Sequence, residues 1–140
     1  MKYRKIGSSY LIRLEKGEKV IEKLEEFCGK EGVRSGHFSG IGGFERVEIA
    51  YYTTEDKKYH PKVFDKPPME LLSIKGNVSL SEAKLKVHAH VVVGDSEFRV
   101  FGGHLIEGIV LPTCEIVFFP FEEMIERKMD GETGLALLDL

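Results

Sequence analysis

The chain has 140 residues, of which 42% are hydrophobic and 31% are charged. This balance is typical of a folded globular domain and excludes a largely disordered chain. We expect residues 1–140 to form a single domain, because their number matches the usual size of one folding unit. The net charge of −3 argues against nucleic-acid binding as the dominant property of the chain, but it leaves room for a local basic patch.

The cysteines and the N-terminus indicate the cellular compartment. Cys28 and Cys114 are far apart and form no Cys-x-x-Cys motif, so we expect both to be core residues in a reducing environment. The N-terminal MKYRK is not followed by the apolar core of a signal peptide. The most apolar stretch, residues 109–121, is interrupted by proline and polar residues and is too short to span a bilayer of ~30 Å. We therefore expect a cytoplasmic protein with no membrane segment.

The N-terminal region predicts a strand followed by a helix. Residues 10–14 (YLIRL) alternate like a strand. Residues 20–28 then place apolar side chains at helical spacing on one stripe, and Gly29 or Gly32 would end the helix. The apolar stripe consists of Val20, Ile21, Leu24, Phe27 and Cys28. A helix with one apolar stripe covers another layer, and we expect that layer to be a sheet.

Residues 33–43 (VRSGHFSGIGG) are rich in glycine and have two interpretations. Closely spaced glycines can cradle a phosphate at the start of a helix. Here, however, they lead into residues 44–53 (FERVEIAYYT), which have the pattern of a strand. We therefore favour a bulged strand and turn, in which His37 is a hydrogen-bonded structural residue.

Residues 54–68 form a polar, proline-bearing segment, which we interpret as a long loop that is mobile or serves as a lid or interface arm. His60 lies near its centre, and we expect it to be solvated. The segment also carries the densest basic cluster of the chain, a candidate DNA contact that consists of Lys57, Lys58, Lys62 and Lys66. A solvated loop is the simpler interpretation of these lysines.

The remaining chain completes an α+β domain with a curved, mainly antiparallel sheet and one main helix. Residues 122–128 could form a helix or an edge strand, residues 131–134 a turn and residues 135–138 a short strand. Further strands are expected at residues 69–74, 76–80, 85–93, 97–105 and 113–119. One helix cannot cover all the apolar side chains of so many strands, so we expect other subunits to cover part of them.

Three histidines in two neighbouring strands are the most informative feature of the sequence. His88 and His90 point to the same face of a strand because they are two residues apart. If residues 94–96 form a three-residue turn, His104 on the returning strand faces the same way. The pairs expected from this turn are His90 with Val100, His88 with Gly102, which would leave space beside His88, and Lys86 with His104. A two-residue turn would instead place His104 on the other face, unless a bulge restored it.

Neutral imidazole is a common zinc ligand, and three imidazoles with an open fourth position are typical of a reactive zinc site. We therefore predict that His88, His90 and His104 bind a divalent metal, most simply zinc. The alternative is that the His-x-His motif is structural, with one ring half-buried and the other hydrogen-bonded. Glu107 is the nearest carboxylate in sequence, but strand alternation points it away, so the spacing specifies no catalytic partner.

Several ordered motifs of the chain resemble the plants and prokaryotes conserved (PPC) domain. They are MELLSIKGN at residues 69–77, HAH at 88–90, GGHLIEG at 102–108 and CEIV at 114–117. The resemblance implies an antiparallel sheet with a helix, assembled as a homotrimer. In plants such a domain follows AT-hook segments in nuclear DNA-binding proteins. This chain has no Arg-Gly-Arg-Pro AT-hook, so the DNA role carries over only weakly.

These observations support two functions. The first is a stand-alone, homotrimeric metal-binding module with a DNA-binding or regulatory role. The second is a zinc-dependent lyase or hydrolase acting on a small molecule, because the three-histidine arrangement is also similar to that of acetolactate decarboxylase. In such an enzyme the open position of zinc would activate water or polarise a carbonyl group. The absence of an obligatory nearby carboxylate favours the module.

Overall fold

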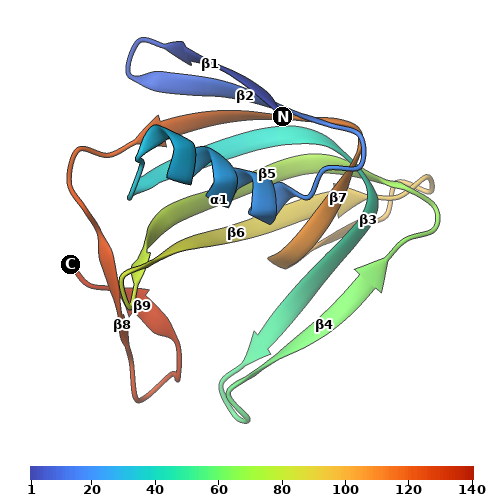
Figure 1. The fold of residues 1–140 in the computed structure, drawn as a ribbon. Coiled ribbons are helices and arrows are strands. Elements are labelled where there is room, and N and C mark those ends of the chain that lie inside the picture. The colour runs from blue at the N-terminus through green and yellow to red at the C-terminus, as the bar shows by residue number, and fades with distance from the viewer.

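The computed structural model describes residues 1–140 and consists of one curved β-sheet with a single helix on one face (Figure 1). Helix α1 spans Val20–Glu31, and it is neither long nor apolar enough to cross a membrane. The strands are β1 (Lys2–Ile6), β2 (Ser9–Glu15), β3 (Gly36–Thr53), β4 (Lys58–Phe64), β5 (Met69–Ser81), β6 (Lys84–Gly94), β7 (Val100–Pro120), β8 (Glu126–Met129) and β9 (Ala136–Leu138). All strand pairs are antiparallel except the short pairing of β5 with β8. The predicted mainly antiparallel sheet with one main helix is confirmed.

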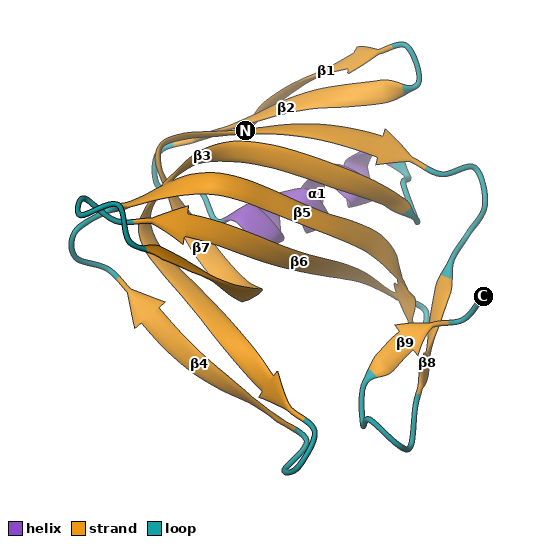
Figure 2. Ribbon diagram, turned by 180° about the vertical axis from the view of Figure 1, so that it is seen from behind, coloured by secondary structure: helices purple, strands orange, loops and turns teal.

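Four central strands form a closed circuit of pairings. Strand β3 pairs with both β5 and β7, and β6 also pairs with both β5 and β7. The sheet therefore curls back on itself, as Figure 1 shows. The β1–β2 hairpin extends the sheet beside β7, whereas β4 and the β8–β9 pair project from it on two sides (Figure 2).

The glycine-rich segment forms the first part of β3, which is the predicted bulged strand and not a phosphate-binding turn before a helix. Its register against β5 shifts between Gly40 and Gly42. A Cβ atom on Gly40 would lie 2.3 Å from the carbonyl oxygen of Glu115, and one on Gly42 would lie 2.3 Å from that of Thr113. Cβ atoms do not approach backbone oxygens so closely, so only glycine permits this approach of β3 to β7.

Helix α1 packs its predicted apolar stripe against the sheet and closes the core. Phe27 and Cys28 are fully buried, and the ring of Phe27 meets that of Phe118 edge-on, with 5.3 Å between centroids. Of the two glycines predicted to end the helix, Gly32 does so with a left-handed φ of 66°, whereas Gly29 lies inside the helix. The predicted burial of both cysteines is confirmed.

The carboxylate of Glu107 caps the start of α1 from strand β7. Its Oε1 accepts hydrogen bonds from the backbone N–H groups of Ile21 at 3.0 Å and Gly108 at 2.8 Å. Lys19, at the N-cap position, provides no side-chain cap of its own. A carboxylate suits this place because it accepts from otherwise unpaired N–H groups and complements the helix dipole. Glu107 therefore serves the helix and does not face the histidines, as predicted.

Pairing between strands overrides several predictions made from local composition. Residues 54–68, predicted as a loop, contain strand β4, which pairs with β3 along its whole length. The separate strands predicted at 69–74 and 76–80 are one strand, β5, and those at 97–105 and 113–119 belong to the single strand β7. Glycine and proline suggest strand breaks in the sequence, but pairing with neighbouring strands carries the chain through them.

The two ends of the chain add strands that local patterns leave open or miss. Strand β1 has no counterpart in the sequence-based prediction, and it forms by pairing with β2. Residues 122–128 contain the start of strand β8 and no helix. The predicted turn at 131–134 and short strand at 135–138 are confirmed, because β9 returns antiparallel to β8.

We predict that Gly40→Ala destabilises the protein. The added methyl group would meet the carbonyl oxygen of Glu115 at 2.3 Å, and overpacking typically costs about 1–3 kcal/mol. Gly29→Ala is the control, since nothing lies within 4 Å of its Cβ position and alanine is the better helix former. Urea unfolding should show a lower midpoint for Gly40→Ala and an equal or higher one for Gly29→Ala. Equal midpoints for Gly40→Ala and wild type would contradict the close approach of the strands.

Candidate metal centre

The β6–β7 hairpin places His90 directly opposite His104. The observed pairs run from Gly94 with Val100 to His90 with His104. The predicted pairs of His90 with Val100, His88 with Gly102 and Lys86 with His104 are therefore wrong. Gly102 lies opposite Val92 and leaves no space beside His88. The neighbouring Gly103 allows the close approach of β7 to β3, because a Cβ atom at this position would lie 2.7 Å from the carbonyl oxygen of Ala50.

The register differs because the turn of this hairpin is longer than predicted. Residues 95–99 form the turn, and the side chain of Asp95 organises it. Its Oδ1 accepts from the backbone N–H groups of Glu97 at 2.9 Å and Arg99 at 3.0 Å, and its Oδ2 accepts from Nε of Arg99 at 2.8 Å. The turn is longer by an even number of residues, so the alternation of faces is preserved. The prediction that the three histidines share one face is confirmed.

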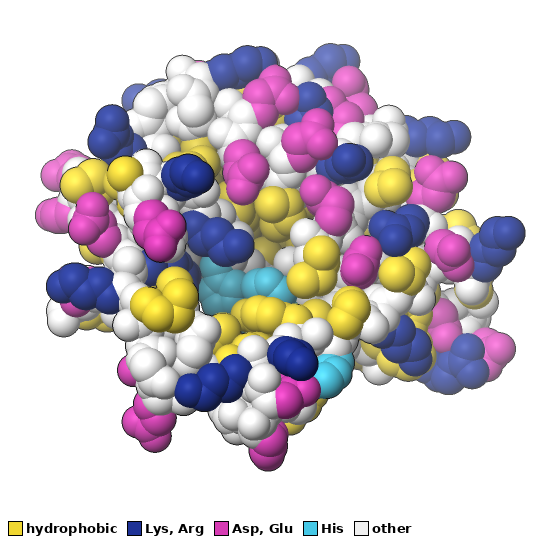
Figure 3. Space-filling model, turned by 60° about the horizontal axis from the view of Figure 1, so that its bottom comes forward, with side chains coloured by type: hydrophobic (Ala, Val, Ile, Leu, Met, Phe, Trp, Pro, Cys, Tyr) yellow, Lys and Arg dark blue, Asp and Glu magenta, His cyan; other side chains and the backbone are white.

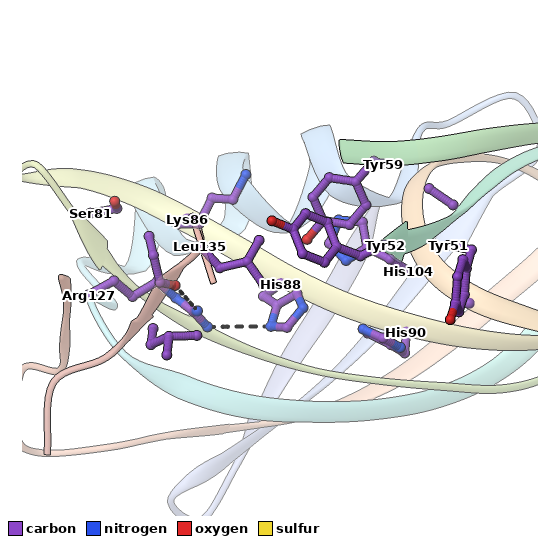
Figure 4. Close-up of a pocket in the computed structure, with 15 residues that line it drawn as sticks. Tyr51, Tyr52, Tyr59, Ser81, Lys86, His88, His90, His104, Arg127 and Leu135 are labelled. Carbon is purple, nitrogen blue, oxygen red and sulfur yellow. Dashed lines mark hydrogen bonds between the residues drawn. The ribbon is translucent and has the colours of Figure 1, made fainter. Parts of the chain in front are cut away.

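His88 and His90 from β6 and His104 from β7 converge on one point of the helix-free face (Figure 4). The centroids of their rings lie 5.1 to 5.5 Å apart. One ring nitrogen from each lies within 4.8 Å of the other two. Tetrahedral zinc would bring such nitrogens to about 3.3 Å from one another, which small side-chain rotations can achieve.

Burial keeps two of the three imidazoles neutral. Burial and then the nearby charge of Arg127 lower the pKa of His88 to about 4. Burial and then the charges of His88 and His90 lower the pKa of His104 to about 4. Both rings are therefore uncharged at neutral pH, which is the form that binds a metal.

One ring nitrogen of the group makes no hydrogen bond, and a bound metal could take the place of the missing partner. The Nδ1 atom of His104 is buried and makes no hydrogen bond. A buried polar atom without a partner typically costs about 1–3 kcal/mol. A divalent ion held by this nitrogen would remove that cost. The donor set of three imidazoles is also that of known zinc sites, so the residues present fit a zinc ion.

The histidines lie in a cavity of about 630 Å³ that is bounded by β3, β4, the end of β5, β6, β7 and the C-terminal tail. Figure 3 shows a group of histidine side chains in a hollow, with apolar and basic side chains around it. The lining of the cavity contains no aspartate or glutamate. The lining residues are Ala50, Tyr51, Tyr52, Tyr59, Ser81, Lys86, His88, His90, Gly103, His104, Arg127, Gly134, Leu135, Ala136 and Leu137. The cavity therefore combines aromatic, aliphatic and basic groups around the three imidazoles.

Two lining residues that the sequence analysis missed contact the histidines. The ring of Tyr59 on β4 lies 4.7 Å from that of His104, between centroids. Nη2 of Arg127 on β8 lies 3.4 Å from Nδ1 of His88. Tyr59 reaches the site through the β3–β4 hairpin and Arg127 through the pairing of β8 with the distant β5, and no local pattern around either residue identifies it.

The other two histidines lie outside the group. His60 is exposed, as predicted, and its Nε2 lies 3.1 Å from Oδ2 of Asp56. His37 packs edge-on against the ring of Phe119, with 4.7 Å between centroids. The hydrogen bond predicted for His37 is not observed, because aromatic packing takes its place.

Two of the four lysines predicted as a DNA contact are engaged within the chain. Lys57 donates a hydrogen bond to the carbonyl oxygen of Gly131 at 2.8 Å, and Nζ of Lys62 lies 5.0 Å from the centroid of an aromatic ring. Lys58 and Lys66 are exposed. The segment that carries Lys58 and Lys62 is strand β4 and not a loop, and neither lysine lines the histidine cavity.

The family model of the Plants and Prokaryotes Conserved (PCC) domain matches residues 1–122. The chain belongs to this family. The name denotes the PPC domain that the sequence motifs resemble, so that prediction is confirmed. Residues 126–138, which form β8 and β9 and supply Arg127 to the cavity, lie beyond the matched part of this PPC chain.

Solved structures of PPC-like proteins share the whole fold. A PPC protein from Pyrococcus horikoshii is 38% identical, with a TM-score of 0.87 over 99% of this chain and 95% of its own. A metal-containing protein from Archaeoglobus fulgidus is 37% identical, with a TM-score of 0.87 over 98% of both chains. A protein from Bacteroides thetaiotaomicron with a provisional DNA-binding name is 29% identical, with a TM-score of 0.94 over 99% of this chain and 96% of its own.

Two further comparisons concern larger proteins. The chain is 28% identical over 135 residues to the bifunctional protein GlmU of Synechococcus sp. strain JA-3-3Ab, but it spans only 20% of that protein. Alpha-acetolactate decarboxylase from Bacillus subtilis is 16% identical, with a TM-score of 0.56 over 90% of this chain and 58% of its own. This likeness concerns the fold alone.

We predict that the metal-free protein loses stability as the pH falls from about 6.5 to about 4. The pKa values of His88 and His104 lie near 4 in the folded chain and near 6.5 when unperturbed, so the unfolded chain takes up protons first. Their contribution is complete above pH 6.5 and is lost as the pH falls towards 4. Melting temperatures measured in chelator should fall more steeply for wild type than for His88→Gln/His104→Gln. Parallel curves for the two proteins would contradict the lowered pKa values.

Proposed function

We propose that residues 1–140 act as one metal-binding PPC domain in which His88, His90 and His104 hold a divalent ion, zinc, next to a small-molecule cavity. The observation that carries this proposal is the convergence of three ring nitrogens within 4.8 Å of one another. The neutral state of two of the rings and the unpartnered Nδ1 of His104 support it. The metal-containing relative from Archaeoglobus fulgidus supports it independently.

Zinc is favoured by the chemistry of the donors. Imidazole suits zinc, whereas calcium and magnesium prefer carboxylate and carbonyl oxygens, which this group lacks. Three protein ligands leave one position of a tetrahedral ion open. His90 is exposed, so that position can be reached from the cavity. The site thus resembles a reactive or ligand-binding zinc centre more than a closed structural one.

A zinc-dependent lyase or hydrolase is the alternative, and the cavity favours it. A volume of about 630 Å³ is within the range of small-molecule sites. Zinc with an open position could activate water or polarise a carbonyl group there. The lining offers no carboxylate as a general acid or base, so an enzyme would have to use a histidine or tyrosine for proton transfer. We therefore place ligand binding before catalysis.

DNA is less well supported as a partner of this chain than a small-molecule ligand. Phosphate neutralisation by lysine and arginine supplies most of the affinity for duplex DNA, and the net charge here is −3. Lys57 and Lys62 of the candidate contact are engaged within the chain. The provisional DNA-binding name of the Bacteroides relative supports such a role, and a ligand-dependent regulatory function would reconcile the two.

We also propose that the domain assembles as a homotrimer through its helix-free face. Strand alternation puts Phe118 in the core under α1, whereas Val117 and Phe119 are 38% and 39% exposed on the opposite face. Leu11 and Ile41 join Val117 in one shallow groove there. Neighbouring exposed apolar side chains of this kind are typical of surfaces that contact another subunit, so a second and third copy are the expected cover. The family resemblance implies the same assembly.

We predict that protein purified without an affinity tag or added metal contains one zinc ion per chain. His88→Ala and His90→Ala should each lose it, because a three-nitrogen site cannot hold zinc firmly with two. The matched controls are His37→Ala and His60→Ala, which remove histidines outside the group and should retain the ion. Elemental analysis by mass spectrometry provides the measurement. Metal that persists in both site variants, or is absent from wild type, would refute the site.

For the assembly, we predict a mass three times that of the 15.8 kDa chain in light scattering at micromolar concentration. Ile41→Lys/Val117→Lys should give monomers, because it replaces two of the three apolar side chains of the groove with charged ones. Met129→Lys is the control, since Met129 is 71% exposed on β8, away from that groove. A monomeric wild type would rule out the trimer.

A further inference from the structure

The cavity beside the histidines carries basic groups without acidic ones. Arg127 and Lys86 line it together with His88, and no aspartate or glutamate does. A divalent ion on the histidines would add two further positive charges. A partly enclosed site with such an excess of positive charge lowers its energy by taking up an anion.

Arg127 is the more informative of the two basic residues because all its contacts are neutral. Its Nε donates to Oγ of Ser79 at 2.8 Å, its Nη1 to the carbonyl oxygen of Ala136 at 2.8 Å and its Nη2 to Oδ1 of Asn77 at 2.7 Å. No carboxylate lies within ion-pair distance of this guanidinium. Arg99, by contrast, pairs with two carboxylates in its turn.

These contacts fix the guanidinium and leave part of it for a ligand. An arginine side chain has five N–H donors, and the bonds to Ser79, Ala136 and Asn77 use three of them. Of the other two, the one on Nη2 faces Nδ1 of His88 at 3.4 Å, and the one on Nη1 has no partner in the chain. Both can serve a carboxylate when Nδ1 of His88 carries a proton and no longer accepts. The site is built before any ligand arrives, because backbone and side-chain acceptors already hold the arginine in place.

The position of Arg127 relative to His88 supports an anion between the metal and the arginine. Nη2 of Arg127 lies 3.4 Å from Nδ1 of His88 (Figure 4). When a histidine holds a metal through Nε2, its Nδ1 carries the proton and cannot accept a hydrogen bond. Arg127 and His88 would then both be donors facing each other. A ligand oxygen that accepts from both of them removes this conflict.

We propose that the cavity binds a small organic carboxylate, with its carboxylate on Arg127 and a neighbouring oxygen directed towards the metal held by the histidines. Lys86 adds positive charge on the same side, and Leu135 and Leu137 offer an apolar wall for a short carbon chain. This inference rests on the proposed metal site and names its ligand class. Arg127 and both leucines lie beyond residues 1–122, so the ligand preference belongs to this chain's tail and not to the matched family region.

Calorimetric titration of the zinc-bound protein tests the proposal. Lactate and pyruvate are the probes, lactamide is the uncharged counterpart of lactate, and inorganic phosphate is the competing anion. We expect both carboxylates to bind and lactamide not to bind. Arg127→Met should raise the Kd for lactate by about tenfold or more, because hydrogen bonds to a charged group are strong. Lys86→Met should raise it less, and Arg34→Met, which alters an exposed arginine outside the cavity, should leave it unchanged.

Zinc content measured on every variant separates this inference from the proposed function. If Arg127→Met retains zinc but binds carboxylates more weakly, the result supports both the metal site and the carboxylate ligand. Three results would refute the carboxylate ligand but leave the metal site in place. They are a wild-type protein that contains zinc but binds no carboxylate, equal affinity for lactate and lactamide, and tighter binding of phosphate than of lactate. Wild type without zinc overturns the metal site and this inference with it. If Arg127→Met fails to fold, Lys86→Met and the lactamide comparison still decide the question.

Discussion

The close approach of β3 to β7 is the constraint on which the rest of the structure depends. Gly40 and Gly42 allow it, because no side chain separates their backbone from the carbonyl oxygens of β7. With β3 so close, the pairings of β3, β5, β6 and β7 close into a circuit, and β7 can reach β6 at its other end. His104 sits where β7 pairs with both β3 and β6, opposite Ala50 on one side and His90 on the other. The histidine group is thus a product of how the sheet curls.

The sequence predicts those parts of this arrangement that follow from local periodicity. The helix at 20–28 and the shared face of the three histidines depend only on spacings of 3.6 and 2 residues, and both are confirmed. The hairpin register was not predictable in this way, because hydrogen bonds that the side chain of Asp95 accepts from Glu97 and Arg99 set the turn length. Tyr59 was missed because the polar segment 54–68 has the composition of a loop although it contains strand β4. Arg127 was missed because β8 pairs with the distant strand β5.

The cavity joins two parts of the chain with different chemistry. The region matched by the family model supplies the three imidazoles, and burial keeps those of His88 and His104 uncharged and ready for a metal. The tail beyond residue 122 supplies a fixed positive charge and an apolar wall. A metal needs an imidazole without a proton on the binding nitrogen, and an anion needs a positive charge without an acidic partner. His88 and Arg127 meet these two requirements, and Nη2 of Arg127 lies 3.4 Å from Nδ1 of His88.

The contacts between the β3–β4 hairpin and the tail have a kinetic consequence. Lys57 donates to the carbonyl oxygen of Gly131, and the hydroxyl of Tyr52 donates to that of Thr133 at 2.5 Å. These two bonds tie opposite walls of the cavity together. Each contributes about 0.5–1.5 kcal/mol, so they break and reform far more often than the core unfolds. The gap between the β3–β4 hairpin and the tail can therefore open and close while the core stays folded.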